Sequence, residues 1–434
     1  MNDLTENFIG AASVDLASLE GSNVPRVSIV AFCETQGAAD TITAASADRR
    51  LRRATVDVRV GGIPRAVEFY GAAPSPELLV LESRACGEDL LNDLENLADV
   101  CDADTKVIVI GASNDVMLYR ELVDRGIADY LVGPVSEVSI IAAISRVYRD
   151  SAPKKLGRTC AFIGAKGGAG ASTVAHNVAW ALAGEPNANI VLADMDLPFG
   201  TAGLDFNLDA EQGIAEAVGD NGRLDEQLLD RLLVRCNERL NLLAAPAMLG
   251  KGYDFDEDAF EQMLDIARAN ASAVVLDMPH VWTAWARRTL VAADEVVIVA
   301  EPTLADLRNA KSLVEILTQA RPNDVPPRLV LNCVGMPKRP EVKPADFAAA
   351  LHLEPLVRIA FDSALFGTAA NKGQMIASVS AKSSACAAFA EVSRVLAGRS
   401  DPKARKGVFG SRLLKMLRLG RNASPAVTHS GART

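Results

Sequence analysis

The sequence predicts an α/β protein that contains two doubly wound parallel sheets. Short apolar segments alternate with helical patterns along most of the chain, and this alternation is typical of parallel sheets covered by helices. The length of 434 residues suits two domains of ordinary size. A short segment at 151–157, with a proline and two lysines, separates two such runs of elements and predicts a linker.

The expected elements divide the chain into five parts. Residues 1–24 are small and polar and predict a flexible N-terminus, and residues 398–434 form a basic tail. A first domain is expected at 25–150 and a second at 158–397, on either side of the linker. The expected strands are buried apolar runs, in the first domain at 26–32, 77–82, 106–110 and 129–132, and in the second at 159–164, 189–193, 240–244, 273–276, 295–300, 328–332 and 356–359.

Composition and charge exclude several classes of protein. Hydrophobic residues make up 49% of the chain, which is enough to build real cores. No run of 18 apolar residues occurs, and no basic stretch precedes an apolar one at the N-terminus, so neither a membrane span nor a secretory signal is expected. The 7 cysteines are scattered, which favours neither zinc nor disulfides and suits a reducing cytosol. A net charge of −10 argues against broad attraction to nucleic acid.

A glycine-rich segment at 166–173 predicts a phosphate-binding loop between an apolar strand and an alanine-rich helix. Backbone N–H groups of such a turn, with the helix N-terminus behind them, cradle anions. The usual loop ends in Gly-Lys-Ser/Thr, but Ala171 stands in the place of that lysine. The alternative is a tight strand-to-helix turn without a ligand. The candidate loop residues are Lys166, Gly167, Gly168, Ala169, Gly170, Ala171, Ser172 and Thr173, of which Ser172 is placed to ligate Mg²⁺.

Polar side chains end three of the expected strands. Asp194 and Asp196 follow the strand at 189–193, Asp277 closes the strand at 273–276, and Asn332 closes the strand at 328–332. Ligands of open α/β sheets bind at this carboxyl edge, and an aspartate there is a usual partner of magnesium. A lone Asp-x-Asp pair could instead simply cap a loop. Together with the loop, these residues favour a nucleotide site.

The first domain resembles the receiver domains of response regulators in its segments 76–82 and 126–134. The resemblance implies a flavodoxin-like fold, but the positions that carry phosphotransfer differ. Glu82 and Gly133 replace the phosphorylated aspartate and the conserved lysine, Cys33-Glu34 replaces the acidic pair, and Gly111 replaces a hydroxyl residue. We therefore expect an interaction or dimerisation module. The alternative is that Glu82 permanently mimics a phosphorylated aspartate.

The second domain resembles the MinD/ParA family of deviant Walker ATPases over residues 158–397. The resemblance implies ATP and Mg²⁺ as cofactors, with Lys166 reaching across a nucleotide-sandwich homodimer to the partner's phosphates. It further implies that Asp196 orients the attacking water as the catalytic residue, that Asp277 and Ser172 serve the metal, and that Asn332 contacts adenine. Because Ala171 lacks the phosphate-binding ammonium group, a loss of two or more powers of ten in hydrolysis rate is expected.

A degenerate receiver joined to a MinD-like domain without the loop lysine resembles the CpaE/TadZ family of Flp (tight-adherence) pilus assembly. The segments 162–173 and 175–180 carry this resemblance. It implies a cytoplasmic, ATP-binding spatial regulator that marks a cell pole and recruits the pilus secretion machinery. The alternatives are a ParA-like partition ATPase that acts on DNA, which the acidic charge and Ala171 argue against, and a nucleotide-free scaffold. A regulator driven by phosphotransfer is disfavoured by Glu82 and Gly133.

The tail predicts contact with an anionic membrane surface through residues 403–421. On a helix, Phe409, Leu413, Met416 and Leu417 share one face, and basic residues lie toward the other side. This pattern is typical of a short helix in the membrane interface, and it would place the protein peripherally at the inner membrane. The alternatives are a solvated basic tail or a helix packed on the protein.

Overall fold

The computed structural model describes residues 24–149, 156–210, 212–219, 224–246 and 255–398. The expected N-terminal segment up to residue 23, most of the expected linker and the tail at 399–434 lie outside these described residues. The proposed membrane contact of residues 403–421 therefore stays a prediction. Within the described residues, no helix has both the length and the apolar character needed to cross a bilayer.

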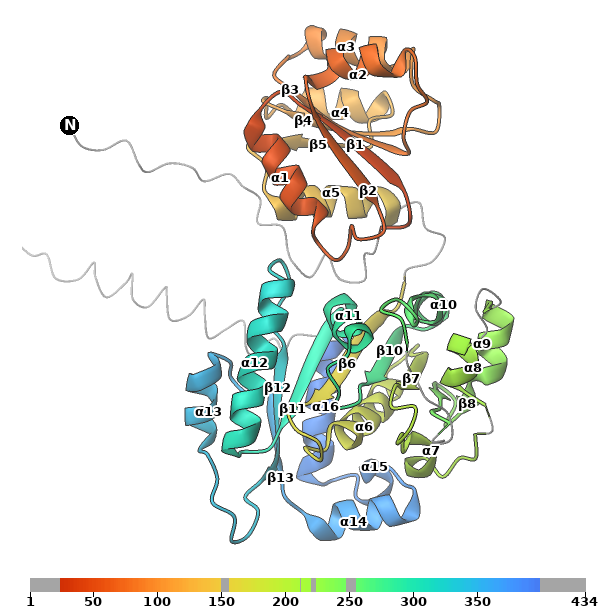
Figure 1. The fold of residues 1–434 in the computed structure, drawn as a ribbon, viewed down its shortest axis with the longest axis vertical. Helices are drawn as coiled ribbons and strands as arrows, with labels where there is room; N and C mark the ends of the chain where they lie inside the picture. Colours follow the sequence, from red (N-terminus) through yellow and green to blue (C-terminus); the bar gives the residue numbers. More distant parts are fainter. Residues whose placement is uncertain (1–23, 150–155, 211, 220–223, 247–254, 399–434) are drawn as a thin grey trace, which may run out of the picture.

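The N-terminal part forms a five-stranded sheet in the order β2-β1-β3-β4-β5 (Figure 1). All of its strand pairs are parallel, and this order is the flavodoxin-like one. The strands are β1 (Ser28–Cys33), β2 (Thr55–Val60), β3 (Leu78–Ser83), β4 (Lys106–Gly111) and β5 (Asp129–Val132). One face packs on α1 (Gln36–Ser46) and α5 (Glu137–Arg149), and the other packs on α2 (Gly62–Tyr70), α3 (Glu88–Ala98) and α4 (Val116–Asp124).

The second part forms an eight-stranded sheet in the order β13-β12-β11-β6-β10-β7-β9-β8. Its neighbours are parallel apart from the β8–β9 pair. The strands are β6 (Arg158–Gly164), β7 (Ile190–Asp194), β8 (Val234–Arg235), β9 (Leu240–Leu243), β10 (Ala273–Asp277), β11 (Glu295–Ala300), β12 (Arg328–Val334) and β13 (Val357–Ala360).

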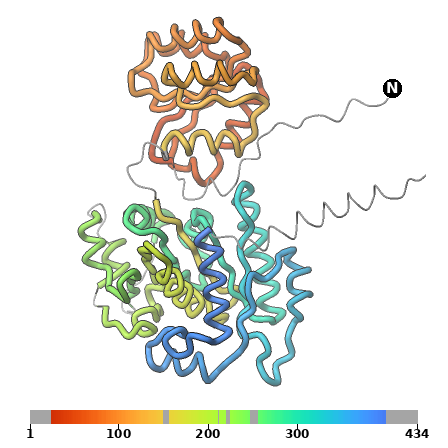
Figure 2. The backbone as a smooth tube through the Cα atoms, turned by 180° about the vertical axis from the view of Figure 1, so that it is seen from behind, coloured from red at the N-terminus to blue at the C-terminus, as the bar shows by residue number. Residues whose placement is uncertain are grey.

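Helices cover both faces of this second sheet. Figure 2 shows α6 and α16 side by side on one face, and their residues share one core with β6 and β7. That face carries α6 (Ala171–Ala183), α7 (Ala202–Asp205), α14 (Ser363–Lys372), α15 (Ile376–Val379) and α16 (Ser384–Leu396). The opposite face carries α8 (Ile214–Gly219), α9 (Glu226–Leu232), α10 (Glu261–Asn270), α11 (Ala284–Ala292), α12 (Leu304–Ala320) and α13 (Pro344–Leu351).

The predicted fold class is confirmed: both sheets are doubly wound and essentially parallel. The sequence prediction was wrong in leaving out β2 and β8. β2 reads Thr-Val-Asp-Val-Arg-Val, and none of its residues is fully buried because it lies at the edge of its sheet. The central strands were predicted from continuous apolar runs. An edge strand that is exposed to solvent on one face does not need such a run. β8 has only 2 residues and gives no periodic signal.

Candidate functional site

The phosphate loop connects β6 to α6 at the carboxyl edge of the second sheet. Gly168 and Gly170 have φ angles of +84° and +85°, a region that favours glycine. A Cβ atom on Gly170 would lie 2.3 Å from the Asn332 amide nitrogen, so a side chain is excluded there. The loop therefore leaves its backbone open in front of the N-terminus of α6, which is the geometry that binds phosphate groups.

The loop side chains lie around this backbone as follows. Ala171 is the first residue of α6, and its methyl group is half-buried where a phosphate-binding loop would carry its lysine. Ser172 and Thr173 follow in the first turn and are also half-buried. Gly167 is exposed, and Ala169 is buried. Of the loop side chains, only Lys166 carries a positive charge.

Lys166 is folded back onto its own domain. Its Nζ lies 3.1 Å from Glu301 Oε2, directly after β11, and 3.1 Å from Asp306 Oδ2, in the first turn of α12. Burial opposes the charge, but hydrogen bonds from the ammonium group to Asp306 and Glu301 outweigh it and raise the pKa of Lys166. The lysine thus rests in an ion cluster beside the loop, with its side chain 38% exposed.

Two aspartates at the end of β7 have different environments. Asp194 is buried, and its carboxylate accepts hydrogen bonds from the backbone N–H groups of Asp196 at 3.2 Å and Ala202 at 3.1 Å. Burial is the main cause, and the negative charge of the nearby Asp277 the second, of a pKa of Asp194 that is raised to about 7. Asp196 is less enclosed, and burial raises its pKa in the same direction. Asp194 therefore shapes the 196–202 turn. Asp196 stays partly exposed, and its Oδ1 accepts a hydrogen bond from the Phe199 backbone N–H at 3.2 Å.

Asp277 presents one carboxylate oxygen that has no partner within the described residues. The side chain is buried at the end of β10, and Oδ1 makes no hydrogen bond there. An unsatisfied buried carboxylate oxygen is costly, so such an atom is normally met by a cation, a water or a ligand. Among the described residues, no three ligating side chains come together as a complete metal site. This arrangement fits a Mg²⁺ ion that arrives with a nucleotide and keeps oxygen ligands from phosphate and water.

His176 holds the other oxygen of Asp277, and sequence reasoning assigned it no role. Its Nε2 lies 3.1 Å from Asp277 Oδ2, and its Nδ1 lies 2.8 Å from Asp205 Oδ2 at the end of α7. Burial opposes protonation of this ring, but hydrogen bonds with Asp205 and Asp277 prevail and raise its pKa to about 10. An imidazolium therefore bridges two carboxylates. The signal in the sequence was a histidine on the buried face of an otherwise apolar helix.

Asn332 lies beneath the loop and within β12, which continues to Val334, so the expected end of this strand at Asn332 was two residues too early. Its Nδ2 donates to the Ala169 carbonyl oxygen at 2.9 Å, and the side chain is buried. In this conformation the amide nitrogen supports the loop backbone. The assignment of Asn332 to adenine contact stays a prediction.

The corresponding edge of the first sheet lacks the groups that phosphotransfer needs. Glu82 is occupied by Thr35, whose backbone N–H and Oγ1 lie 2.7 and 2.8 Å from its carboxylate oxygens. A Cβ atom on Gly111 would lie 2.1 Å from the Tyr130 hydroxyl oxygen, so Tyr130 fills the space that a hydroxyl residue would need. Tyr130 is fixed in turn because its hydroxyl donates to the Ser113 carbonyl at 2.8 Å.

We expect that incubation with acetyl phosphate and Mg²⁺ leaves this domain unmodified. Glu82 is already paired with Thr35, and Gly133 provides no ammonium group to stabilise an acyl phosphate. Mass spectrometry of the intact protein is the measurement, with the Glu82→Asp variant as the control. That variant should stay unmodified too, because the shorter carboxylate still lacks the lysine. A stable phosphoryl adduct at residue 82 in either protein would contradict the interpretation.

Fold and loop together define a P-loop protein of the MinD/ParA-like class. The family model described as an AAA domain matches residues 157–326. The septum site-determining protein MinD of Synechocystis sp. is 26% identical over 245 residues, which cover 55% of this chain and 88% of that protein.

Two solved structures of pilus assembly proteins show a higher identity. A crystal structure of CpaE from Caulobacter crescentus CB15 is 43% identical and covers 29% of this chain and 95% of its own, with a TM-score of 0.28. A putative CpaE2 pilus assembly protein from Sinorhizobium meliloti 1021 is 45% identical and covers 28% of this chain and 99% of its own, with a TM-score of 0.28. The chain therefore belongs to the CpaE/TadZ family of ParA-like ATPases.

Proposed function

We propose that this chain is an ATP-binding spatial regulator that localises the Flp (tight-adherence) pilus assembly and secretion machinery at a cell pole, with slow hydrolysis of ATP. The observation that carries the proposal is the loop edge of the second sheet. The open glycine backbone, Lys166 of the same loop and Asp277, whose Oδ1 has no partner among the described residues, all lie at this edge. In the proposal these groups serve as a phosphate cradle, an acid for a phosphate-bound Mg²⁺ and a positive charge for the phosphates.

Exposed apolar side chains around the same edge support a homodimer that closes over the nucleotide. In the described part of the second domain, all but one of the exposed large apolar side chains follow β7, β10 or β11, the exception being Ile316 on α12. A patch of this kind normally marks a protein interface. Beside the loop, a groove of about 300 Å³ is lined by His280, Trp282 and Ile316. The patch comprises Phe199, Leu204, Val281, Trp282 and Leu304.

The site also explains why turnover should be slow. Ala171 offers no charge to the β- and γ-phosphates, and Lys166 must leave Glu301 and Asp306 before it can reach any phosphate. In this proposal Asp196 would orient a water molecule, and Asp277, aided by Ser172, would hold Mg²⁺ through the nucleotide. When bound, the metal would neutralise charge on the phosphates. Because hydrolysis is slow, the protein would retain bound ATP and act through the dimer that it forms.

The role in pilus assembly is supported by family membership. The relatives of higher identity are described as pilus assembly proteins. We propose the same setting for this chain: the cytoplasm, with peripheral attachment at the inner membrane and the pole, and with the pilus secretion machinery as partner. A fluorescent fusion in the protein's own host tests this proposal, since a diffuse signal in piliated cells would contradict it.

ATP with Mg²⁺ is expected to bind and to convert the protein from monomer to dimer. Calorimetry measures the binding, and analytical ultracentrifugation measures the assembly. Lys166→Ala should still bind ATP but should fail to dimerise, because the charge that crosses to the partner's phosphates is lost. Lys311→Ala is the matched control: this lysine lies on α12, is 56% exposed and should leave both measurements unchanged.

The alternatives predict other outcomes in the same experiments. The absence of any heat of ATP binding would favour the nucleotide-free scaffold. A salt-sensitive shift of DNA with ATP would favour the partition ATPase, but the acidic net charge of −10 opposes such binding.

A further inference from the structure

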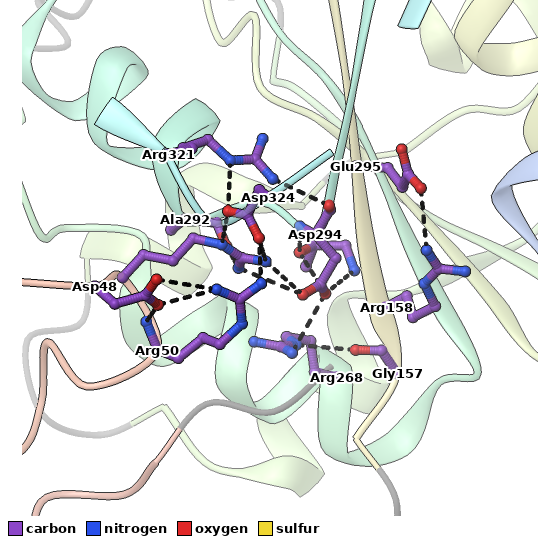
Figure 3. Close-up of polar contacts among 12 residues, drawn as sticks. Asp48, Arg50, Gly157, Arg158, Arg268, Ala292, Asp294, Glu295, Arg321 and Asp324 are labelled. Carbon is purple, nitrogen blue, oxygen red and sulfur yellow. Dashed lines mark hydrogen bonds and ion pairs between the residues drawn. The ribbon is translucent and has the colours of Figure 1, made fainter. Parts of the chain in front are cut away.

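A buried ion network joins the two domains (Figure 3). It lies where β11 begins, whereas the phosphate loop follows the opposite end of the parallel strand β6. Arg49 belongs to the segment 47–54 between α1 and β2, and its side chain enters the second domain beside the start of β11. Its Nε lies 2.7 Å from Asp324 Oδ2, and its Nη1 lies 2.9 Å from the Ala292 carbonyl oxygen and 3.4 Å from Asp294 Oδ1. The side chains of Arg49, Asp294 and Asp324 are 4%, 1% and 5% exposed. Arg50 adds a second contact to Asp324.

The two acidic acceptors of Arg49 lie at one end each of β11 and α12, the ends that face the first domain. Asp294 directly precedes β11, and Asp324 follows α12 by a few residues. Arg321 ties these ends together, because it donates to the Asp294 carbonyl oxygen at 3.1 Å and to Asp324 Oδ2 at 3.0 Å. Through Arg49, the receiver-like domain thus contacts both the start of β11 and the residues that follow α12.

The far ends of the same two elements hold Lys166. Glu301 follows β11, Asp306 lies in the first turn of α12, and both contact the lysine at 3.1 Å. The Glu301 backbone N–H donates to Asp306 Oδ1 at 3.1 Å, which joins these ends as Arg321 joins the others. α12 also touches the loop itself, because Asn309 Nδ2 donates to the Ala165 carbonyl oxygen at 2.9 Å.

β11 and α12 are suited to transmit a displacement from one end to the other. β11 is completely buried and lies between β6 and β12 near the middle of the sheet. α12 has 17 residues, and its buried face packs into the same core as β11. Close-packed interiors have low compressibility and transmit strain. A shift at Asp294 and Asp324 would therefore be passed on to Glu301 and Asp306.

We infer that docking of the receiver-like domain through Arg49 stabilises the state in which Glu301 and Asp306 hold Lys166, so that undocking favours release of the lysine to a nucleotide. The inference rests on the proposed function for its nucleotide step. Coupling of this kind is reciprocal, and withdrawal of Lys166 must therefore loosen the docked domain. The receiver fold then acts as a brake on dimerisation, a role that needs no phosphotransfer.

Hydrogen exchange of the full chain tests the coupling without a nucleotide. Arg49→Ala should speed exchange in segment 47–54 and also in segment 301–308. Lys166→Ala should speed exchange in 301–308 and, reciprocally, in 47–54. Arg65→Ala, which removes an exposed arginine of α2 away from this network, is the matched control and should change neither segment. Faster exchange confined to the mutated end in either variant would overturn the inference and leave the network as a simple attachment.

The ATP titration followed by ultracentrifugation tests the consequence for the site. Arg49→Ala should dimerise at an ATP concentration about fivefold or more below that of the wild type, a typical size for coupling between sites. An unchanged or higher midpoint would overturn the inference. If the wild type does not dimerise with ATP at all, the proposed function fails, and the exchange comparison alone still decides the coupling. Should Arg49→Ala not fold, Arg49→Lys keeps the charge without the planar fork and should show smaller changes of the same sign.

Discussion

Ala171→Lys is expected to raise the rate of ATP hydrolysis by about two powers of ten. Position 171 is the first residue of α6, directly after the glycine turn, and the alanine side chain there is only half-buried. Because this side chain is only partly enclosed, we expect a lysine here to extend along the loop toward the phosphates. One preorganised donor to the developing charge contributes about 10²–10³ in rate. Under the proposed function, Asp196 and Asp277 would still serve the water and the metal.

The measurement is single-turnover hydrolysis of radiolabelled ATP with Mg²⁺. Ala171→Met is the matched control, because methionine has similar length without the charge, and it should leave the rate near that of the wild type. Equal acceleration by both variants would mean that packing of α6, rather than charge, limits the reaction. No acceleration by lysine would show that the slow step lies elsewhere, for example in release of Lys166 from Glu301 and Asp306.

The sequence predicted those parts of the fold that depend on local pattern. β3 and β11 are almost completely buried, so their apolar runs stand out in the sequence. The phosphate loop could be predicted as well, because the backbone conformation at Gly168 and Gly170 requires glycine and so leaves a pattern in the sequence. β2 escaped detection because an edge position needs no continuous apolar run.

The groups that regulate the site could not be predicted, because they depend on contacts between distant segments. Glu301 and Asp306 lie 135 and 140 residues from Lys166 in the chain. Arg49 and Arg50 belong to a charged loop whose sequence pattern is typical of solvated surface, but both side chains are buried where the loop meets Asp324. The partners of a charge are set by the packing of whole elements, which a single sequence does not display.

His176→Leu is expected to lower the free energy of unfolding by about 3–5 kcal/mol, because it leaves a buried carboxylate without its counter-charge. Asp277 is only 3% exposed and cannot turn to water, whereas Asp205 is 26% exposed and can. The loss should also tilt Asp277 and weaken binding of the Mg²⁺–nucleotide complex. Chemical denaturation and calorimetry measure the two effects.

The double variant His176→Leu/Asp277→Asn is the matched control for stability. It removes the carboxylate charge that the single variant leaves buried without a counter-charge. Part of the lost stability should therefore return, whereas nucleotide binding should not recover. The pH dependence gives a second check. The pKa of His176 is raised to about 10, above its usual value of 6.5, so the difference in stability between wild type and His176→Leu should be full below pH 6.5 and should disappear as the pH rises through about 10. A difference that stays constant over this range would show that the ring acts by packing against Phe206 rather than as an imidazolium between two carboxylates.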